Sequence, residues 1–135
     1  MSDSCIFCRI AQKEAPASTV YEDDSVIAFM SIQPIGVGHT LVIPKKHYET
    51  IYEILEDELA YLYKIVKKVA QAVKKAAEAD GIKIVQNNGE VAGQVIPHLH
   101  VHIIPVSKDR PWGHHTESRD GETLNADAQK IQQFI

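Results

Sequence analysis

The most informative stretch of this 135-residue chain reads His98-Leu99-His100-Val101-His102-Ile103-Ile104. Apolar residues alternate with the three histidines, and a period of two residues is typical of a β-strand whose two faces differ. One face would be buried in a core, so the other face presents three imidazoles in a row. Because an unperturbed imidazole has a pKa of ~6.5, these rings can exchange protons, attack electrophiles or bind metal near neutral pH. The stretch therefore predicts a reactive strand face.

Other interpretations of the three histidines are a simple row of metal ligands and a histidine-rich low-complexity tract. The intervening residues are all strand formers, which argues against the tract. A strand histidine can also be an ordinary half-buried residue with a satisfied hydrogen bond. The spacing favours a reactive face over these alternatives, but it does not indicate which reaction that face would carry out.

Length and composition favour one globular domain spanning residues 1–135. Hydrophobic residues make up 44% of the chain, which suits a buried core. The formal net charge of -4 argues against sequence-independent binding of nucleic acid but permits a nucleotide-sized ligand. No apolar run approaches the ~20 residues of a membrane span, and the N-terminus lacks the features of a signal peptide. We therefore expect a cytoplasmic protein that binds neither a membrane nor a nucleic-acid polymer.

The two cysteines, Cys5 and Cys8, stand in a C-x-x-C arrangement. In a reducing compartment this spacing indicates metal or redox chemistry. A thioredoxin-like site would follow a strand, and no strand precedes this pair. Zinc is the better interpretation, but the pair supplies only two of the usual four ligands.

Hydrophobic periodicity outlines the remaining elements. Apolar residues recur at spacings of three and four between residues 55 and 80, which predicts a long amphipathic helix with Gly81 as its C-cap. A short terminal helix is expected at residues 126–135, with Asn125 as its N-cap. Strands are expected at residues 20–22 and 25–30, as a hairpin around Asp23-Asp24, and at residues 40–43, 82–86 and 98–104. These elements predict an α+β fold with an antiparallel meander.

Together, these segments resemble the histidine triad (HIT) superfamily of nucleotide hydrolases and transferases, in particular its small prokaryotic branch with a metal site. The resemblance covers nearly the whole chain. It rests on Cys5-Ile6-Phe7-Cys8, Gly38-His39-Thr40-Leu41-Val42-Ile43-Pro44-Lys45-Lys46-His47, Asn87-Asn88-Gly89, Gly93-Gln94 and residues 98–104, in the family's order. It implies a HIT-like fold with a zinc-tethered N-terminal segment at residues 1–10 and a tail at residues 106–135.

The resemblance also implies the chemistry. His100, the middle histidine, would attack the α-phosphorus of a purine nucleoside phosphoramidate or dinucleoside polyphosphate, forming a covalent nucleotidyl-histidine that water then releases. His102 would donate to the phosphate or the leaving group, and His39 would be an auxiliary histidine beside the nucleophile. Asn87 and Gln94 would give neutral hydrogen bonds near the phosphate. For His39, Asn87 and Gln94, the alternative is a polar residue that satisfies loop backbone.

A structural zinc site is also implied by the resemblance. In the metal-containing branch, the first triad histidine joins the cysteine pair and a histidine after the central strand, which here gives Cys5, Cys8, His47 and His98. A Cys₂His₂ set is closed and tetrahedral, and therefore structural rather than catalytic. The alternative is that the two cysteines are ordinary thiols near a mobile terminus.

Two positions depart from the family's pattern. Ser31 stands where many members have an aspartate that grips the ribose hydroxyls, so it offers the substrate only one short hydroxyl. Val95 stands where many have a serine or threonine near the phosphate. A nucleotide-binding or interaction protein with weak catalysis therefore remains an alternative to an enzyme. A pure zinc module is a third possibility, which leaves His100 and His102 without a purpose.

A two-fold symmetric homodimer is implied by the resemblance, with the sheet extended across the subunits. Independently, a small sheet ends in edge strands, and exposed edges are usually paired or covered. Trp112, in the irregular tail, is expected to reach toward the partner's site. His114 and His115 fall outside the family motif and are expected to be solvated loop residues.

Overall fold

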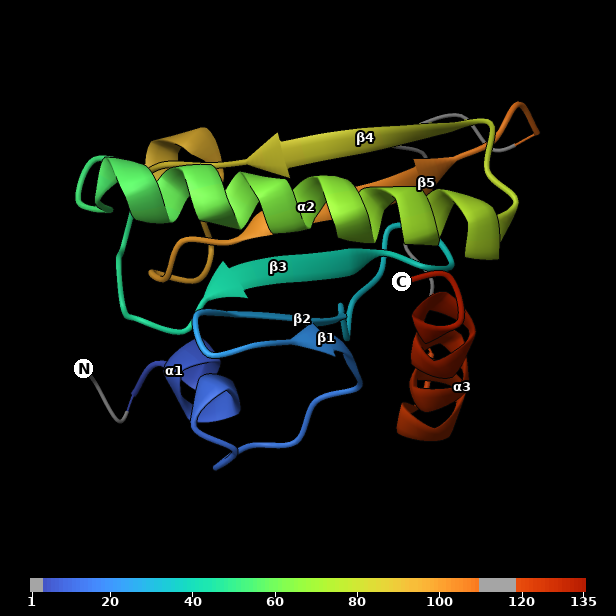
Figure 1. The fold of residues 1–135 in the computed structure, drawn as a ribbon, viewed down its shortest axis with the longest axis horizontal. Helices are drawn as coiled ribbons and strands as arrows, with labels where there is room; N and C mark the ends of the chain where they lie inside the picture. The colour runs from blue at the N-terminus through green and yellow to red at the C-terminus, as the bar shows by residue number, and fades with distance from the viewer. Residues whose placement is uncertain (1–3, 110–118) are drawn as a thin grey trace.

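The computed structural model describes residues 4–109 and 119–135 (Figure 1). Its elements are α1 (Ile6–Ala11), β1 (Thr19–Glu22), β2 (Val26–Met30), β3 (Thr40–Pro44), α2 (Glu56–Ala77), β4 (Gly81–Gln86), the 3₁₀ turn η1 (Glu90–Ala92), β5 (Val101–Val106) and α3 (Gly121–Gln132). Within these ranges, no helix combines the length and the apolarity that crossing a membrane requires. Trp112, His114 and His115 lie outside the described residues.

The strands form one antiparallel sheet in the order β1-β2-β3-β5-β4. The first hairpin turns at Asp23, whose carboxylate accepts hydrogen bonds from the backbone N–H groups of Ser25 and Val26. α2 then carries the chain from β3 to the far edge of the sheet, and β5 returns between β3 and β4 (Figure 1). The predicted α+β class and antiparallel sheet are confirmed, and the order departs from a simple meander at this one crossover.

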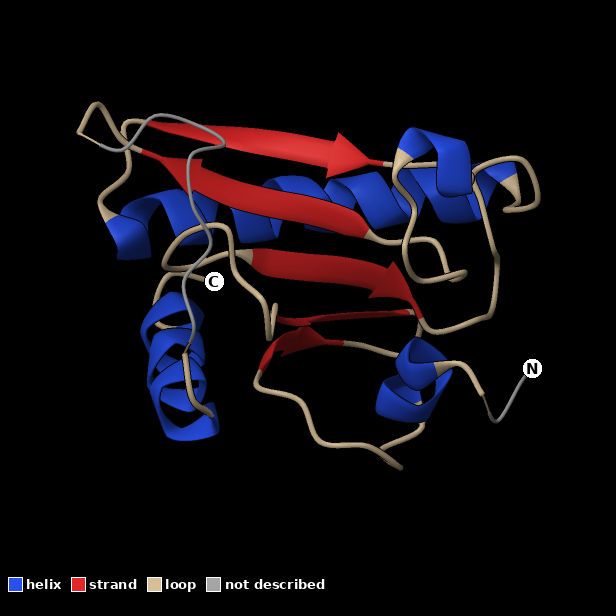
Figure 2. Cartoon of the chain, turned by 180° about the vertical axis from the view of Figure 1, so that it is seen from behind, coloured by secondary structure: helices blue, strands red, loops and turns tan. Residues whose placement is uncertain are grey.

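Helices pack on both faces of the sheet. α2 and α3 pack on one face, against a cluster that includes Val42, Leu99 and Val101. α1 packs on the opposite face, against residues such as Ile27 and Phe29. In Figure 2 the sheet is seen from behind, with α2 beyond it. Because both faces are covered, β2 and β3 are buried at every residue.

The long helix ends earlier than predicted. α2 stops at Ala77, and Glu78 rather than Gly81 takes the left-handed conformation at its C-cap, with φ 51°. The backbone N–H of Glu78 donates to the carbonyl of Lys75 and closes the last turn. Gly81 is instead the first residue of β4, where it pairs with Val106. The C-cap is therefore the polar residue Glu78, three residues before the glycine that the sequence pattern favours.

The two shorter helices also differ from expectation. α3 begins at Gly121 because the carboxylate of Asp120 accepts the backbone N–H of Thr123 at 2.8 Å, so Asp120 is the N-cap and Asn125 lies inside the helix. α1 was not expected at all. Its N-cap is Cys5, whose sulfur accepts the backbone N–H of Cys8 at 3.3 Å.

The last strand begins at Val101, three residues later than predicted. Val101 has ladder partners on both sides, Val42 in β3 and Gln86 in β4, and it is the first residue of β5 to do so. Before it, the backbone N–H of Leu99 donates to the carbonyl of Tyr48 at 2.7 Å. Only the second half of the histidine segment is therefore in the ladder, and His98 lies in a bend, where its backbone N–H donates to the carbonyl of Ile96 at 2.9 Å.

Candidate active site and metal cluster

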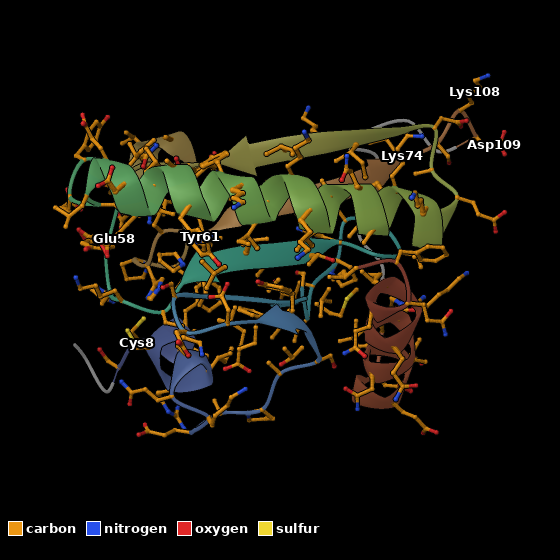
Figure 3. All side chains as sticks on the ribbon, in the orientation of Figure 1. Cys8, Glu58, Tyr61, Lys74, Lys108 and Asp109 are labelled. Carbon is orange, nitrogen blue, oxygen red and sulfur yellow. The ribbon has the colours of Figure 1, made fainter. Side chains whose placement is uncertain are left out.

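Four side chains from separate segments meet beside the end of β3. Cys5 is the N-cap of α1, and Cys8 lies within that helix. His47 follows β3, and His98 precedes β5. Their ligand atoms all lie within 4.8 Å of one another. Figure 3 labels Cys8 on α1, next to the sheet. The four residues that the resemblance named as metal ligands are thus brought together.

The distances within this cluster suit a tetrahedral metal. Sγ of Cys8 lies 3.0 Å from Nδ1 of His47 and 3.5 Å from Nδ1 of His98, and Sγ of Cys5 lies 3.4 Å from Nδ1 of His98. A tetrahedral zinc ion with bonds of about 2.3 Å to sulfur and about 2.1 Å to nitrogen separates those atoms by roughly 3.5 Å. Both cysteines are free of a disulfide. The donor set and its spacing therefore fit zinc.

The ring of His98 is oriented from behind by the backbone. Its Nε2 lies 2.8 Å from the carbonyl oxygen of Pro44, and a carbonyl only accepts, so the proton is on Nε2. The lone pair of Nδ1 is left facing the two sulfurs. Burial lowers the pKa of His98 to about 4, which favours the neutral ring that a metal requires. A histidine ligand is commonly oriented by such an outer contact.

His100 is held in the opposite tautomer. Its Nδ1 donates to the carbonyl oxygen of His98 at 2.7 Å, so the lone pair is on Nε2. The residue is buried, and burial lowers the pKa of its ring, which is therefore neutral at pH 7. The ring of Phe7 in α1 packs edge-on against it, with centroids 5.1 Å apart. A fixed, neutral imidazole with a free Nε2 is what nucleophilic attack requires.

His102 and His39 complete a contiguous group of rings. The centroid of the His102 ring lies 4.9 Å from that of His100. Nδ1 of His102 lies 3.0 Å from Nε2 of His39, and Nδ1 of His39 lies 3.0 Å from the backbone nitrogen of Ile35. Burial, reinforced by the neighbouring imidazoles, lowers the pKa of His102 to about 4 and that of His39 to about 3. The rings of His39, His100 and His102 are therefore all neutral at pH 7.

The buried His39 makes stability sensitive to acid. We expect the free energy of unfolding to fall as the pH drops below about 6.5, the pKa of histidine in an unfolded chain. Between that value and the folded pKa of about 3, the unfolded chain binds a proton that the folded protein excludes. Urea denaturation at several pH values from 7 to 5 measures the slope. His39→Gln removes this titration and should lessen the slope, whereas an unchanged slope would contradict the assignment.

The candidate substrate residues are placed differently. Gln94 is buried, and its carboxamide accepts from the backbone N–H of Gly89 and donates to the carbonyls of Glu49 and Ile96. These bonds brace the loop over residues 87–94, which matches the alternative that Gln94 satisfies loop backbone. Val95, directly after it, is 85% exposed.

The side chains of Asn87 and Ser31 also bond to local backbone. Asn87 donates to the carbonyl of Gly93 at 3.4 Å. The hydroxyl of the buried Ser31 accepts from the backbone N–H of Gln33 at 3.3 Å. The contacts of both residues with a substrate stay a prediction.

Several contributors to the site were missed by sequence reasoning. Phe7 lies between the two cysteines and packs against His100, and its only sequence signal was its place inside the C-x-x-C spacing. The carbonyl of Pro44 and the backbone N–H of Ile35 orient His98 and His39. Backbone groups are common to nearly all residue types, so no pattern of side chains reveals them.

Comparison with known proteins gives a consistent picture. The family model described as HIT domain matches residues 12–109. An uncharacterized HIT-like protein of Methanocaldococcus jannaschii is 48% identical over 94% of this chain and 95% of its own length. Adenosine 5'-monophosphoramidase HNT1 of Candida albicans is 39% identical over 82% of this chain and 74% of its own. Adenylylsulfatase HINT3 of Arabidopsis thaliana is 35% identical over 97% of this chain and 67% of its own.

Solved structures agree with these relatives. A HIT-like protein involved in cell-cycle regulation from Bartonella henselae superposes with a TM-score of 0.90 at 41% identity, covering 100% of this chain and 99% of its own. A Zn-bound histidine triad family protein from Mycobacterium smegmatis superposes with a TM-score of 0.86 at 30% identity, covering 96% of this chain and 91% of its own.

Proposed function

This chain belongs to the HIT family, and we propose that it is a nucleotide hydrolase or nucleotidyl transferase acting at the α-phosphate of a purine nucleoside phosphoramidate or a dinucleoside polyphosphate. The observation that carries the proposal is the state of His100, a neutral, buried ring whose proton is fixed on Nδ1. Relatives named for a monophosphoramidase and an adenylylsulfatase activity support the substrate class.

In the first step, Nε2 of His100 attacks the α-phosphorus and a phosphorus–nitrogen bond forms. The bond between phosphorus and the leaving atom breaks, and its electron pair stays on that atom. A phosphate leaves as its anion, and an amine leaves after its nitrogen has been protonated from solvent. Nδ1–H of His100 keeps its bond to the carbonyl of His98, which stabilises the positive charge that develops on the ring.

In the second step, water or another acceptor attacks the same phosphorus. The phosphorus–nitrogen bond breaks, its electron pair returns to Nε2 of His100, and the proton of the attacking water passes to solvent. The product is a nucleoside monophosphate, or a new nucleotidyl ester if the acceptor is not water. Splitting the transfer in two lets one ring serve both halves of the reaction.

Zinc would be held by Cys5, Cys8, His47 and His98, and when bound it supplies rigidity rather than chemistry, because four protein ligands close its coordination sphere. The ligand His98 also provides the carbonyl that orients His100, so the metal would brace the nucleophile through the backbone. The two cysteines must stay reduced to bind the metal. We therefore place the protein in the cytoplasm.

The proposal is tested by incubating the zinc-loaded protein with adenosine phosphoramidate and, separately, with a diadenosine polyphosphate, while AMP release is measured. Release of AMP well above the rate of the His100→Ala variant supports the enzyme. Tight nucleotide binding without release would favour the alternative, a nucleotide-binding protein with weak catalysis. That alternative draws on Ser31, whose short hydroxyl already bonds to the backbone of residue 33.

We also propose a two-fold dimer joined through the edge of the sheet. β4 pairs with β5 on one side, and its Ile84 side chain is 44% exposed. We expect light scattering at dilute concentration to give twice the 15.0 kDa mass of one chain. Ile84→Lys should shift the mass toward one chain if this edge forms the interface. A monomeric mass for the unmodified protein would contradict the dimer.

A further inference from the structure

His39 is fixed between a backbone donor and a neighbouring ring. It is 2% exposed, its Nδ1 lies 3.0 Å from the backbone nitrogen of Ile35, and its Nε2 lies 3.0 Å from Nδ1 of His102. A backbone N–H only donates, so Nδ1 of His39 is an acceptor. A neutral imidazole carries a single ring proton, which in His39 must therefore be on Nε2.

The same reasoning extends to His102. Nε2–H of His39 donates to Nδ1 of His102, so the one proton of a neutral His102 is on its Nε2. Burial keeps both rings neutral at pH 7, with pKa values of about 3 for His39 and about 4 for His102. A single backbone N–H, that of Ile35, thus determines where the protons lie on two side chains in succession.

The adjacent rings of His100 and His102 consequently have opposite tautomers. His100 has its proton on Nδ1, directed by the carbonyl of His98, and presents a lone pair on Nε2. His102 presents an N–H at the equivalent ring position. One ring is thus prepared to attack phosphorus, and the next is prepared to donate to a phosphoryl oxygen, where negative charge increases during attack.

We propose that His39 is a positioning residue that acts through His102, transmitting the direction of the Ile35 N–H so that His102 is an Nε2–H donor to the phosphoryl group. The donor role rests on the proposed function, whereas the tautomers do not. His39 is neither a second nucleophile nor a base, because its Nδ1 lone pair already accepts from Ile35 and its Nε2 carries the proton.

The tautomers can be measured directly. Long-range ¹H–¹⁵N NMR spectra of the ¹⁵N-labelled, zinc-loaded protein at pH 7 report which ring nitrogen is protonated in each histidine. We expect Nε2–H for His39 and His102, and Nδ1–H for His100. Observation of His102 as Nδ1–H, or as a doubly protonated ring, would overturn the proposal without any reference to activity.

Paired variants test the consequence for turnover. In His39→Gln, the amide of the new side chain can still donate to His102, whereas His39→Leu has no donor of any kind. We expect His39→Leu to lower kcat by about 10²-fold, the typical loss for one transition-state donor, with a smaller change in KM. His39→Gln should recover most of that loss and keep the Nε2–H signal of His102. Equal kcat in the two variants would refute the positioning role.

A second pair tests the origin of the effect at residue 35. Ile35→Pro removes the backbone N–H, whereas Ile35→Ala keeps it and controls for the lost side chain. We expect a mixture of His102 tautomers in Ile35→Pro and a single Nε2–H form in Ile35→Ala. A single Nε2–H form in a folded, zinc-loaded Ile35→Pro protein would show that the N–H of Ile35 is not the determinant.

The outcomes separate the two proposals. If the tautomers are as expected but no AMP is released, the proposed function fails and the assignment of His39 and His102 stands. If AMP is released while His102 is Nδ1–H, the function stands and the positioning role of His39 fails.

Discussion

Replacing His100 with alanine is expected to reduce AMP release from adenosine phosphoramidate by at least about 10⁴-fold, because no other group can take the place of a covalent nucleophile. Among the neighbouring rings, His98 presents its free lone pair to the cysteine sulfurs, and the lone pair of His102 accepts from His39. His100 alone in this group has a lone pair that is not already engaged. Steady-state kinetics of the zinc-loaded variant measure the loss.

The control for this variant is structural integrity. Zinc content and the urea midpoint should change little, because the side chain of His100 is not among the proposed ligands. Rapid quench with substrate labelled at the α-phosphate should trap an acid-labile adduct on the unmodified protein and none on the variant. Turnover of His100→Ala at the unmodified rate would eliminate His100 as the nucleophile.

Replacing Cys8 with serine is expected to remove zinc and to lower the free energy of unfolding by several kcal/mol, roughly the scale on which closed metal sites stabilise small domains. Cys8 contacts both candidate histidine ligands, His47 at 3.0 Å and His98 at 3.5 Å, and it is 1% exposed. Elemental analysis of protein purified without added metal measures the zinc, and urea denaturation measures the stability.

A chelator provides the matched control for Cys8→Ser. It should lower the thermal midpoint of the unmodified protein to about that of the variant and leave the variant unaffected, since both treatments end in the same metal-free state. Protein that is free of zinc as purified, with a midpoint unaffected by added zinc, would rule out a structural site. In that case the four side chains would form a hydrogen-bonded cluster of thiols and imidazoles instead.

The alternation of residues 98–104 predicted which side chains of this segment face the core and which face the site. Leu99, Val101 and Ile103 point into the core with α2, as a period of two requires, and the histidines take the other face. The sequence could not show that α1 packs on that face, where its Phe7 contacts His100, because six residues are too few to display a helical period. It also could not show that β5 starts at Val101, since that start depends on where β3 and β4 offer ladder partners, which the alternation of side chains does not encode.

The tautomers lay beyond sequence analysis for a different reason. They depend on the carbonyls of Pro44 and His98 and on the N–H of Ile35, and their placement follows from tertiary packing alone. The resemblance implied that Gln94 bonds near the phosphate. In the structure, its carboxamide instead bonds to the backbone of residues 49, 89 and 96. The residue types therefore predicted which side chains lie at the candidate site, whereas their hydrogen-bond partners are known only from the structure.

The position of β5 also has a consequence for how the protein is made. Among the described strands it comes last in the sequence, yet it lies between β3 and β4, so both of its neighbours in the sheet are synthesised before it. The proposed nucleophile, the proposed donor beside it and one of the proposed metal ligands all belong to β5 or to the segment just before it. The strand that completes the sheet therefore also brings the proposed catalytic histidines, and we expect a chain truncated before residue 98 to form no nucleotidyl adduct.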